Sequence, residues 1–555
     1  MKTISYTVST KYKVIEVTQI RLKVNHSDSE LRQALFKKLN IIPNEEIKWK
    51  IFKCSIDARK KGTIGVRLIY TIHVDAGLNE QSLLSKIKNK TAKIVQKKIF
   101  NEPIKTNTKL KNRPIIIGSG PCGYFAALYL ARSGKKPIVV ERGKEAGPRA
   151  RDVTRFWREG GQANPESNVQ FGEGGAGTFS DGKLYTGIKD KDGAVRMVLE
   201  ELASHGAPDN ILVKGKPHIG TDKLITVLRS IRNEIIDLGG TIKFETRVDN
   251  IIQKSGKIIG IITSEGKEII SDNIILAVGH SARDTFSMLL ENGVSMVSKP
   301  FSIGARIEHP QKMIDKSLYG DLSGNQKLGA APYKFVRHQN KKNARSCYSF
   351  CMCPGGLVVA ASSEPGHTVT NGMSSYARAD ANANSGFMVE IFPNDFDNPD
   401  DPLSGVQFQR KWERKAFLLG GPKGHAPAQL LGDFMQNTPS SSLGEVTPSY
   451  RPGVVLTDLR ECLPKYVIET MQSTVKRVSD QISGFDRKDA ILTAAETRSS
   501  SPLRINRNSS YQSPSIEGLY PAGEGAGYAG GILSAAVDGL RVAEAVNINI
   551  ESSLL

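Results

Sequence analysis

The glycine-rich hexapeptide Gly118–Gly123 leaves few folds open to the segment that contains it. It follows a short apolar run, Ile115–Ile117, and precedes a segment of helical length, Tyr124–Arg132, and a second apolar run, Pro137–Val140. This order predicts a β-α-β unit in which the glycines allow a tight turn, a close approach to a pyrophosphate, and close packing of helix on strand. Glu141 ends the second predicted strand, where a carboxylate can accept both hydroxyls of a ribose. The pattern predicts a dinucleotide site, rather than a tight turn without a ligand, with contacts from Gly118, Gly120, Pro121, Cys122, Gly123, Glu141 and Arg142.

A second glycine-rich segment, Gly518–Ile532, lies about 400 residues downstream and leads into a helical run, Leu533–Val546. An enzyme that binds only a nicotinamide cofactor needs no segment so far downstream to complete its nucleotide site. FAD is longer, and a last strand of the same domain can cover its ribityl chain. Glu524 is expected at the ribityl or pyrophosphate region, and a helix N-terminus is expected to point at the flavin pyrimidine ring, where it favours the anionic reduced flavin. The segment therefore predicts FAD, with contacts from Gly523, Glu524, Gly530, Gly531 and Ile532.

With these two ends, the chain resembles the glutathione-reductase-type FAD superfamily. More narrowly, it resembles a family of large bacterial FAD-dependent dehydrogenases, NAD(P)/FAD-dependent oxidoreductases that carry an extra N-terminal domain. The resemblance covers nearly the whole chain and implies a non-covalently bound FAD. It is much less specific for the substrate.

Three further segments fit this resemblance. The glycine-rich loop Phe171–Lys183 stands where the superfamily lays backbone against the flavin ring and pyrophosphate, and side chains would collide there. The segment Thr246–Ile251 is expected to end a short strand, and its Val248 would meet adenine through the backbone. The run Asn273–Gly279 resembles the strand at which such chains leave the FAD domain. The resemblance thus adds Gly174, Gly175, Gly177, Ser180, Val248 and Gly279 to the expected cofactor contacts.

Charge separates the first part of the chain from the rest. The 555 residues carry a net charge of +20, most of it before residue 114. The expected elements there are a strand (13–24), a helix (29–39), strands (46–56 and 63–74) and a helix (80–99), followed by a linker over 101–113. This order of elements suggests a ferredoxin-like or related α/β plait. Because the domain is basic, it could bind nucleic acid, with Arg59-Lys60-Lys61 and the lysines between Lys86 and Lys98 as phosphate contacts. Aromatic residues are sparse, so a solvated or domain-docking face is favoured over nucleic acid.

The predicted fold class is α/β. A three-layer Rossmann-type FAD-binding domain holds an inserted α+β substrate domain and follows an N-terminal ferredoxin-like plait. The expected boundaries are 1–105 for the plait, 112–294 for the first part of the FAD domain, 295–489 for the substrate domain and 490–555 for the closing part of the FAD domain. In the substrate domain, Pro300–Glu308 is an expected strand.

Three cysteines, Cys347, Cys351 and Cys353, fall within seven residues of the expected substrate domain. Zinc and iron–sulfur sites usually need four ligands at set spacing, and the chain has no second cysteine cluster, so no metal is expected. Strand alternation would put all three side chains on one buried face. Simple packing is favoured, and the alternative is a thiol near the flavin, for which Cys353 is best placed and which the family resemblance favours.

Three polar residues are further catalytic candidates. His280 follows the exit strand and could move protons, and Arg283 could bind an anionic substrate, although a helix-capping turn with exposed charges explains both about as well. Arg498 stands before the closing strand and could face substrate or flavin.

The sequence therefore predicts an FAD-dependent oxidoreductase, a dehydrogenase or reductase, that exchanges hydride or electrons with a small organic substrate. Residues 190–490 hold no second complete Gly-x-Gly-x-x-Gly unit, so either NAD(P)H docks transiently or another donor, such as an electron-donor protein, reduces the flavin. The alternative is a tRNA-modifying flavoprotein that uses the basic N-terminal domain for RNA. No apolar run approaches the ~20 residues of a membrane span, and without a signal-peptide core the expected location is the cytoplasm.

Overall fold

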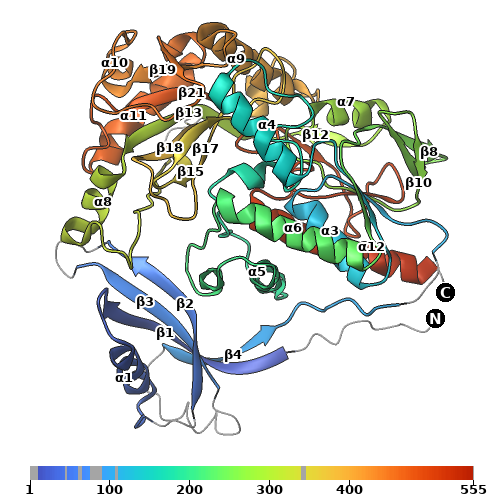
Figure 1. Ribbon diagram of the computed structural model, residues 1–555, viewed down its shortest axis with the longest axis horizontal. Helices are drawn as coiled ribbons and strands as arrows, with labels where there is room; N and C mark the ends of the chain where they lie inside the picture. Colours follow the sequence, from blue (N-terminus) through green and yellow to red (C-terminus); the bar gives the residue numbers. More distant parts are fainter. Residues whose placement is uncertain are drawn as a thin grey trace.

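The protein is described here by a computed structural model, which covers residues 11–43, 47–59, 65–75, 91–106, 110–338 and 345–553 (Figure 1). Figure 1 shows a four-stranded sheet near the N-terminus, drawn in blue, set below a larger body that contains the other sheets. Three helices, α3 (Pro121–Arg132), α6 (Thr221–Asp237) and α12 (Ile532–Ser553), cross the middle of that body, where α3 contacts both of the others.

A five-stranded parallel sheet forms the centre of the nucleotide-binding fold. Its strand order is β23-β11-β5-β6-β7, and every neighbouring pair runs parallel. The strands are β5 (Ile115–Ile117), β6 (Ile138–Val140), β7 (Thr241–Lys243), β11 (Ile274–Leu276) and β23 (Leu519–Pro521). The first and last of these strands in sequence are about 400 residues apart, yet only β11 lies between them. This is the doubly wound arrangement in which ligands bind at the carboxyl ends of the strands.

Two different layers cover the faces of this sheet. Because strand residues alternate between faces, Ile116 packs into one apolar cluster and Ile115 and Ile117 pack into another. The first cluster belongs to helices α3 (Pro121–Arg132), α5 (Ala194–Ser204), α6 (Thr221–Asp237) and α12 (Ile532–Ser553). The second belongs to helix α7 (Arg283–Glu291) and to the antiparallel strands β8 (Val248–Lys254), β9 (Lys257–Thr263) and β10 (Glu268–Ile270). The expected three-layer α/β fold is confirmed, although the segment around Val248 begins a strand instead of ending one.

A seven-stranded sheet, ordered β14-β15-β18-β13-β21-β19-β20, makes up most of the expected substrate domain. Its strands are β13 (Phe301–Pro310), β14 (Val336–Arg337), β15 (Cys347–Cys353), β18 (Asn382–Ile391), β19 (Ala426–Leu430), β20 (Val454–Leu456) and β21 (Ile491–Glu496). The associated helices are α8 (Gln311–Tyr319), α9 (Ser404–Gly420), α10 (Leu431–Gln436) and α11 (Lys465–Ser479). Strand β21 pairs with β13 and β19, so this sheet continues past the boundary expected at residue 489.

Smaller elements complete this part of the fold. Helix α4 (Ala146–Glu159) contacts α6. Two short antiparallel pairs join β12 (Met296–Ser298) to β22 (Leu503–Ile505) and β16 (Leu357–Ala360) to β17 (Thr370–Met373). The first of these pairs holds the segment before the substrate sheet against the segment after it.

The N-terminal sheet has the strand order β2-β3-β1-β4, with every pair antiparallel. Its elements are β1 (Lys11–Lys23), α1 (Asp28–Leu39), β2 (Lys48–Asp57), β3 (Arg67–Asp75) and β4 (Ala92–Lys98). A capping box between Ser27 and Glu30 starts α1. The helix expected over 80–99 is wrong for 92–98, which form the edge strand β4, and residues 80–90 lie outside the described part of the chain. The strand order is that of a ferredoxin-like plait.

This sheet docks on the nucleotide-binding body through the outer edge of β2. The Cys54 amide donates to the Val213 carbonyl oxygen, and the Gly215 amide donates to the Cys54 carbonyl oxygen, each at 2.7 Å. Beside this bridge, Arg196 lies over the ring of Phe52 at 5.9 Å. One edge of the basic domain is therefore an intramolecular contact surface.

Candidate functional site

One cavity of about 630 Å³ runs along the carboxyl ends of the parallel strands, a volume in the usual range for ligand sites. Its walls come from segments that are far apart in the sequence. It brings together these expected residues: Gly118, Gly120, Pro121, Cys122, Glu141, Arg142, Gly175, Gly177, Ser180, Val248, Gly279, His280, Arg498, Glu524, Gly530, Gly531 and Ile532. Gly123, Gly174, Arg283, Cys353 and Gly523 are not among the lining residues.

The first glycine turn has the geometry that its sequence pattern requires. Gly118 has a φ of +103°, a conformation that side chains rarely adopt. A Cβ at Gly123 would lie 1.9 Å from the Gly118 carbonyl oxygen, so only glycine lets α3 begin this close to β5. At Gly120, by contrast, the nearest atom to an added Cβ is the Gly175 Cα, 4.0 Å away. A Cβ at Gly175 would lie 3.3 Å from the Gly120 Cα, so the two glycines let the backbones approach closely beside the N-terminus of α3, where the amides of the first helical turn can bind a pyrophosphate.

Glu141 lies in the cavity wall with its carboxylate held by four donors. One oxygen accepts from the Ser119 amide at 2.9 Å and the Ser119 hydroxyl at 2.8 Å. The other accepts from the amides of Gly143 and Gly172, both at 2.9 Å. These bonds use the four lone-pair positions of the carboxylate, so a ribose hydroxyl would have to replace the Ser119 hydroxyl.

The neighbouring Arg142 lies over the Phe171 ring, 4.3 Å from its centroid, and its guanidinium pairs with Glu166 and Asp284. The cavity continues from there to Thr246, Arg247 and Val248. The guanidinium and ring offer flat surfaces on which a base can stack.

At the opposite end of the cavity, Glu524 and His280 face each other before the N-terminus of α12. The Nδ1 of His280 lies 3.9 Å from Oε1 of Glu524, and its Nε2 lies 3.0 Å from the Arg498 carbonyl oxygen. Burial lowers the pKa of His280 to about 4 and raises the pKa of Glu524 to about 7. His280 is therefore neutral at pH 7. Because a carbonyl oxygen only accepts, we assign the imidazole proton to Nε2, which leaves the lone pair of Nδ1 toward Glu524.

The cysteine segment approaches the same cavity, through Cys351. A one-residue bulge between Phe350 and Cys353 interrupts the pairing of β15 with β18, and Cys351 has a φ of +42°. The alternation expected from the sequence therefore breaks: Cys347 and Cys353 are fully buried, while Cys351 is half-buried in the cavity wall. Both sulfurs of the Cys351–Cys353 pair contact the Lys183 ammonium.

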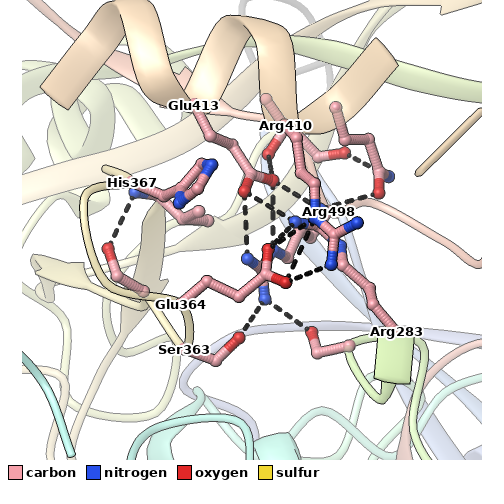
Figure 2. Close-up of polar contacts among 12 residues, drawn as sticks. Arg283, Ser363, Glu364, His367, Arg410, Glu413 and Arg498 are labelled. Carbon is pink, nitrogen blue, oxygen red and sulfur yellow. Dashed lines mark hydrogen bonds and ion pairs between the residues drawn. The ribbon is translucent and has the colours of Figure 1, made fainter. Parts of the chain in front are cut away.

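Arg283 and Arg498 belong to a buried cluster of ion pairs, shown in Figure 2. The carboxylate of Glu413, on α9, accepts from both guanidiniums at 2.7 to 3.1 Å. Arg283 also bonds Glu364 at 2.5 Å, and Arg498 also donates to Ser281 and Ser363. Every nitrogen of the Arg498 guanidinium thus has a protein partner, and the backbone carbonyl oxygen of Arg498 contacts His280 in the cavity wall.

Two residues at the cavity went unnoticed in the sequence. Lys183 lines the cavity, and its ammonium lies 3.1 Å from the buried Asp181 carboxylate, which also binds Arg378. Both residues lie in the loop Phe171–Lys183. An acidic and a basic residue two positions apart in a glycine-rich loop were the signal that could have revealed them. The buried Glu413 gave no local signal, because its partners are 85 and 130 residues away in sequence.

The cavity fits FAD. A Cβ added at Gly279, Gly530 or Gly531 would meet no protein atom within 4 Å, so these glycines border open space where a ligand can touch backbone. The N-termini of α3 and α12 both border the cavity, and the positive ends of their dipoles favour a phosphate and a reduced flavin ring there. Among the described residues, no group of His, Cys, Asp and Glu has the arrangement of a metal site, and no helix there combines the length and apolarity that a bilayer crossing requires.

Three family models match successive parts of the chain. Residues 14–75 match a domain of unknown function, residues 112–287 match pyridine nucleotide-disulphide oxidoreductase, and residues 300–499 match the C-terminal domain-like region of FAD-dependent proteins. These matches confirm FAD as the cofactor and an oxidoreductase as the class of enzyme. They lend no support to the tRNA-modifying alternative.

Individual proteins are also similar to this chain. An uncharacterized protein of Clostridium beijerinckii is 48% identical over 531 residues, which cover 96% of this chain and 98% of that protein. Protein FixC of Escherichia coli K12 is 30% identical over 227 residues, 39% of this chain and 47% of FixC. A geranylgeranyl bacteriochlorophyll reductase-like protein of Thermoplasma acidophilum has a TM-score of 0.37 and 12% identity, with coverage of 80% of this chain and 79% of that one. The chain belongs to the family of the Clostridium beijerinckii protein, and it is an FAD-dependent oxidoreductase.

Proposed function

We propose that this enzyme transfers a hydride, or two electrons, between non-covalently bound FAD and a small organic substrate in the cavity described above, and that it is of the glutathione-reductase type. The observation that carries the proposal is the cavity itself. One continuous space joins the glycine turn of α3 to the N-terminus of α12 and to the pair His280 and Glu524. FAD, when bound, supplies the redox chemistry, and the protein supplies orientation, proton transfer and exclusion of water.

We propose the following division of the cofactor-binding residues. The turn at Gly118, Gly120, Pro121, Cys122 and Gly123 and the loop with Gly174, Gly175, Gly177 and Ser180 would hold the pyrophosphate and flavin backbone. Glu141, Arg142 and Val248 would hold the adenosine end. Gly279, Gly523, Glu524, Gly530, Gly531 and Ile532 would close over the ribityl chain and the flavin.

Proton transfer is assigned to Glu524 and His280. With a pKa raised to about 7, Glu524 can give up or take back a proton near neutral pH without a large cost. His280 accepts at Nδ1 and holds its own proton at Nε2 against the Arg498 carbonyl oxygen. The pair can thus deliver one proton at the flavin end of the cavity each time electrons pass.

Arg283 and Arg498 act as positioning residues in this scheme. Both guanidiniums are paired with Glu413, which leaves Arg283 outside the cavity lining. Arg498 fixes the His280 ring through its carbonyl oxygen. NAD(P)H that docks transiently, or an electron-donor protein, remains our proposal for the reductant.

The test is anaerobic reduction of the FAD-loaded enzyme by NADH and by NADPH, followed by flavin absorbance. Bleaching by either nucleotide, slowed at least tenfold in Glu524→Gln, is the expected result. Glu517→Gln is the matched control, because Glu517 is an exposed carboxylate that pairs with Lys257, and neither residue lines the cavity. A purified protein that binds no FAD after reconstitution would overturn the proposal, and so would equal reduction rates in Glu524→Gln and the control.

A further inference from the structure

Two cysteine thiols and one lysine ammonium meet at the cavity wall opposite the nucleotide turn. The Lys183 Nζ lies 3.9 Å from the Cys351 sulfur and 3.7 Å from the Cys353 sulfur. Two sulfurs that contact one ammonium, on cysteines two residues apart, are close enough for the short movement that a disulfide requires.

The backbone explains how residues two apart come to this position. In a regular strand both side chains would point to the same face from separate pleats. Here the bulge and the left-handed conformation of Cys351 turn its thiol into the cavity, while Cys353 stays fully buried behind it and bonds the Cys351 carbonyl oxygen at 3.2 Å. One thiol is accessible from the cavity and the other is shielded, which is the arrangement of an attacking and a resolving cysteine.

Two positive charges, Lys183 and Arg306, lie beside the pair. The neighbouring Cys353 thiol and these two charges lower the pKa of Cys351 well below its ordinary value. The neighbouring Cys351 thiol and burial raise the pKa of Cys353. Arg306 is itself fixed, because it pairs with Glu496 at 2.9 Å and donates to the Cys351 carbonyl oxygen at 2.8 Å. Cys351 is also the thiol that lines the cavity, so it is the one placed to attack a substrate as a thiolate, the nucleophile of disulfide exchange.

We propose that Cys351 and Cys353 form a thiol–disulfide exchange pair, so that disulfides are a substrate class of this cavity. The Cys351 thiolate attacks one sulfur of a disulfide R–S–S–R, forms a mixed disulfide and releases R–S⁻. The Cys353 thiol then passes its proton to the released R–S⁻ and attacks the Cys351 sulfur. The Cys351–Cys353 bond forms and the second R–S⁻ leaves, so the substrate gains the two electrons that the protein thiols lose.

Return of the pair to its reduced state rests on the proposed function. The protein disulfide must accept two electrons and two protons to become two thiols again. Reduced FAD is the two-electron donor that the proposed activity would supply to the cavity that Cys351 lines. The first half of the cycle, oxidation of the pair by a disulfide, needs no flavin.

The experiment uses the full chain, both FAD-loaded and FAD-free, with hydroxyethyl disulfide as the probe. After a brief treatment and alkylation of the remaining thiols, peptide mass spectrometry measures each cysteine. We expect one Cys351–Cys353 disulfide per chain, with Cys347 still alkylated as a free thiol. In Cys353→Ser the mixed disulfide should instead accumulate on Cys351, and in Cys351→Ser neither product should form.

Cys347→Ser is the matched control, because Cys347 lies in the same strand, is fully buried and is absent from the cavity lining. It should form the Cys351–Cys353 disulfide at the wild-type rate. A second measurement uses Lys183→Met, in which the rate of Cys351 alkylation against pH should shift to higher pH.

The inference is overturned if no bridge forms in either flavin state, or if a mixed disulfide on Cys351 persists in the wild type. Failure of the proposed function has a different signature: no FAD is bound or reduced, while the bridge still forms in the FAD-free chain.

Discussion

Glu413 makes the strongest test of how the buried charges hold this fold together. Its side chain is fully buried, and its two oxygens accept four bonds from Arg283 and Arg498 and one from the Thr497 hydroxyl at 2.7 Å. The two guanidiniums hold the pKa of this carboxyl well below its ordinary value. Replacement by glutamine keeps the shape and removes the charge.

The size of the effect follows from the contacts. A glutamine that keeps its carbonyl at the Oε1 position places an amide nitrogen where Oε2 accepts one bond from each arginine, at 2.9 and 3.0 Å. Two charge-assisted bonds are lost, each worth about 1.5–3 kcal/mol. Two buried cations also lose their counter-charge, a change that costs about 3–5 kcal/mol in comparable pairs. These are two views of the same loss, so we expect Glu413→Gln to lower the free energy of unfolding by about 3–5 kcal/mol.

Equilibrium urea unfolding measures this quantity, with tryptophan fluorescence as the signal, because Trp412 precedes Glu413 on α9. Glu517→Gln is the control, since the Lys257–Glu517 pair is more than 60% exposed on both sides and its loss should cost under about 1 kcal/mol. If Glu413→Gln loses no more stability than this control, the buried cluster does not stabilise the structure as argued. A changed slope against urea would instead indicate an altered unfolded or native state.

The other predictions concern the cofactor turn, the proton donor and acid stability. Gly123→Ala should purify with at least tenfold less FAD, because its Cβ would overlap the Gly118 carbonyl oxygen. The control Gly147→Ala, with no atom within 4 Å of the new Cβ, should keep its FAD. Equal FAD content in both variants would contradict the turn geometry. Glu524 carries its proton below pH 7 and loses it above, so flavin reduction that uses this proton should slow as pH rises through about 7, and the inflection should be absent from the pH–rate profile of Glu524→Gln. Burial raises the pKa of Glu364, but its ion pairs with Arg410 and Arg283 and the nearby charge of Arg498 lower that pKa to about 2. The stabilising effect of Glu364 is therefore full above pH 4.5 and is lost as pH falls toward 2; acid unfolding of Glu364→Gln, followed by circular dichroism, should lack that part of the pH dependence.

The nucleotide-binding half could be predicted from the sequence because its constraints are local. The clash between Gly123 and Gly118 arises within six residues, so the required glycines stand next to each other in the chain. The closing segment with Glu524 has the same property, since a turn and a helix start follow each other directly. Local geometry of this kind leaves a readable pattern.

The missed features depend on partners distant in sequence. Residues 92–98 are rich in lysine and were expected to be helical. Lysine is also common on exposed edge strands, where its charge prevents pairing with another chain, and these residues form such a strand. The bulge that turns Cys351 into the cavity is an irregularity in the pairing of β15 with β18, which a rule of strict alternation cannot anticipate. Arg283 faces Glu413 instead of substrate because α9 packs against it, and nothing near Arg283 in the sequence indicates that helix.

The position of β23 at one edge of the parallel sheet bears on the order of events during synthesis. A nascent chain translated as far as residue 500 already has β5, β6, β7 and β11, but it lacks β23, Glu524 and the start of α12. The Glu524 turn and the start of α12, which form part of the cavity wall, would therefore be missing until residues 519–535 leave the ribosome. Capture of the coenzyme must then follow synthesis of this segment, and a message truncated before codon 519 should yield a colourless protein.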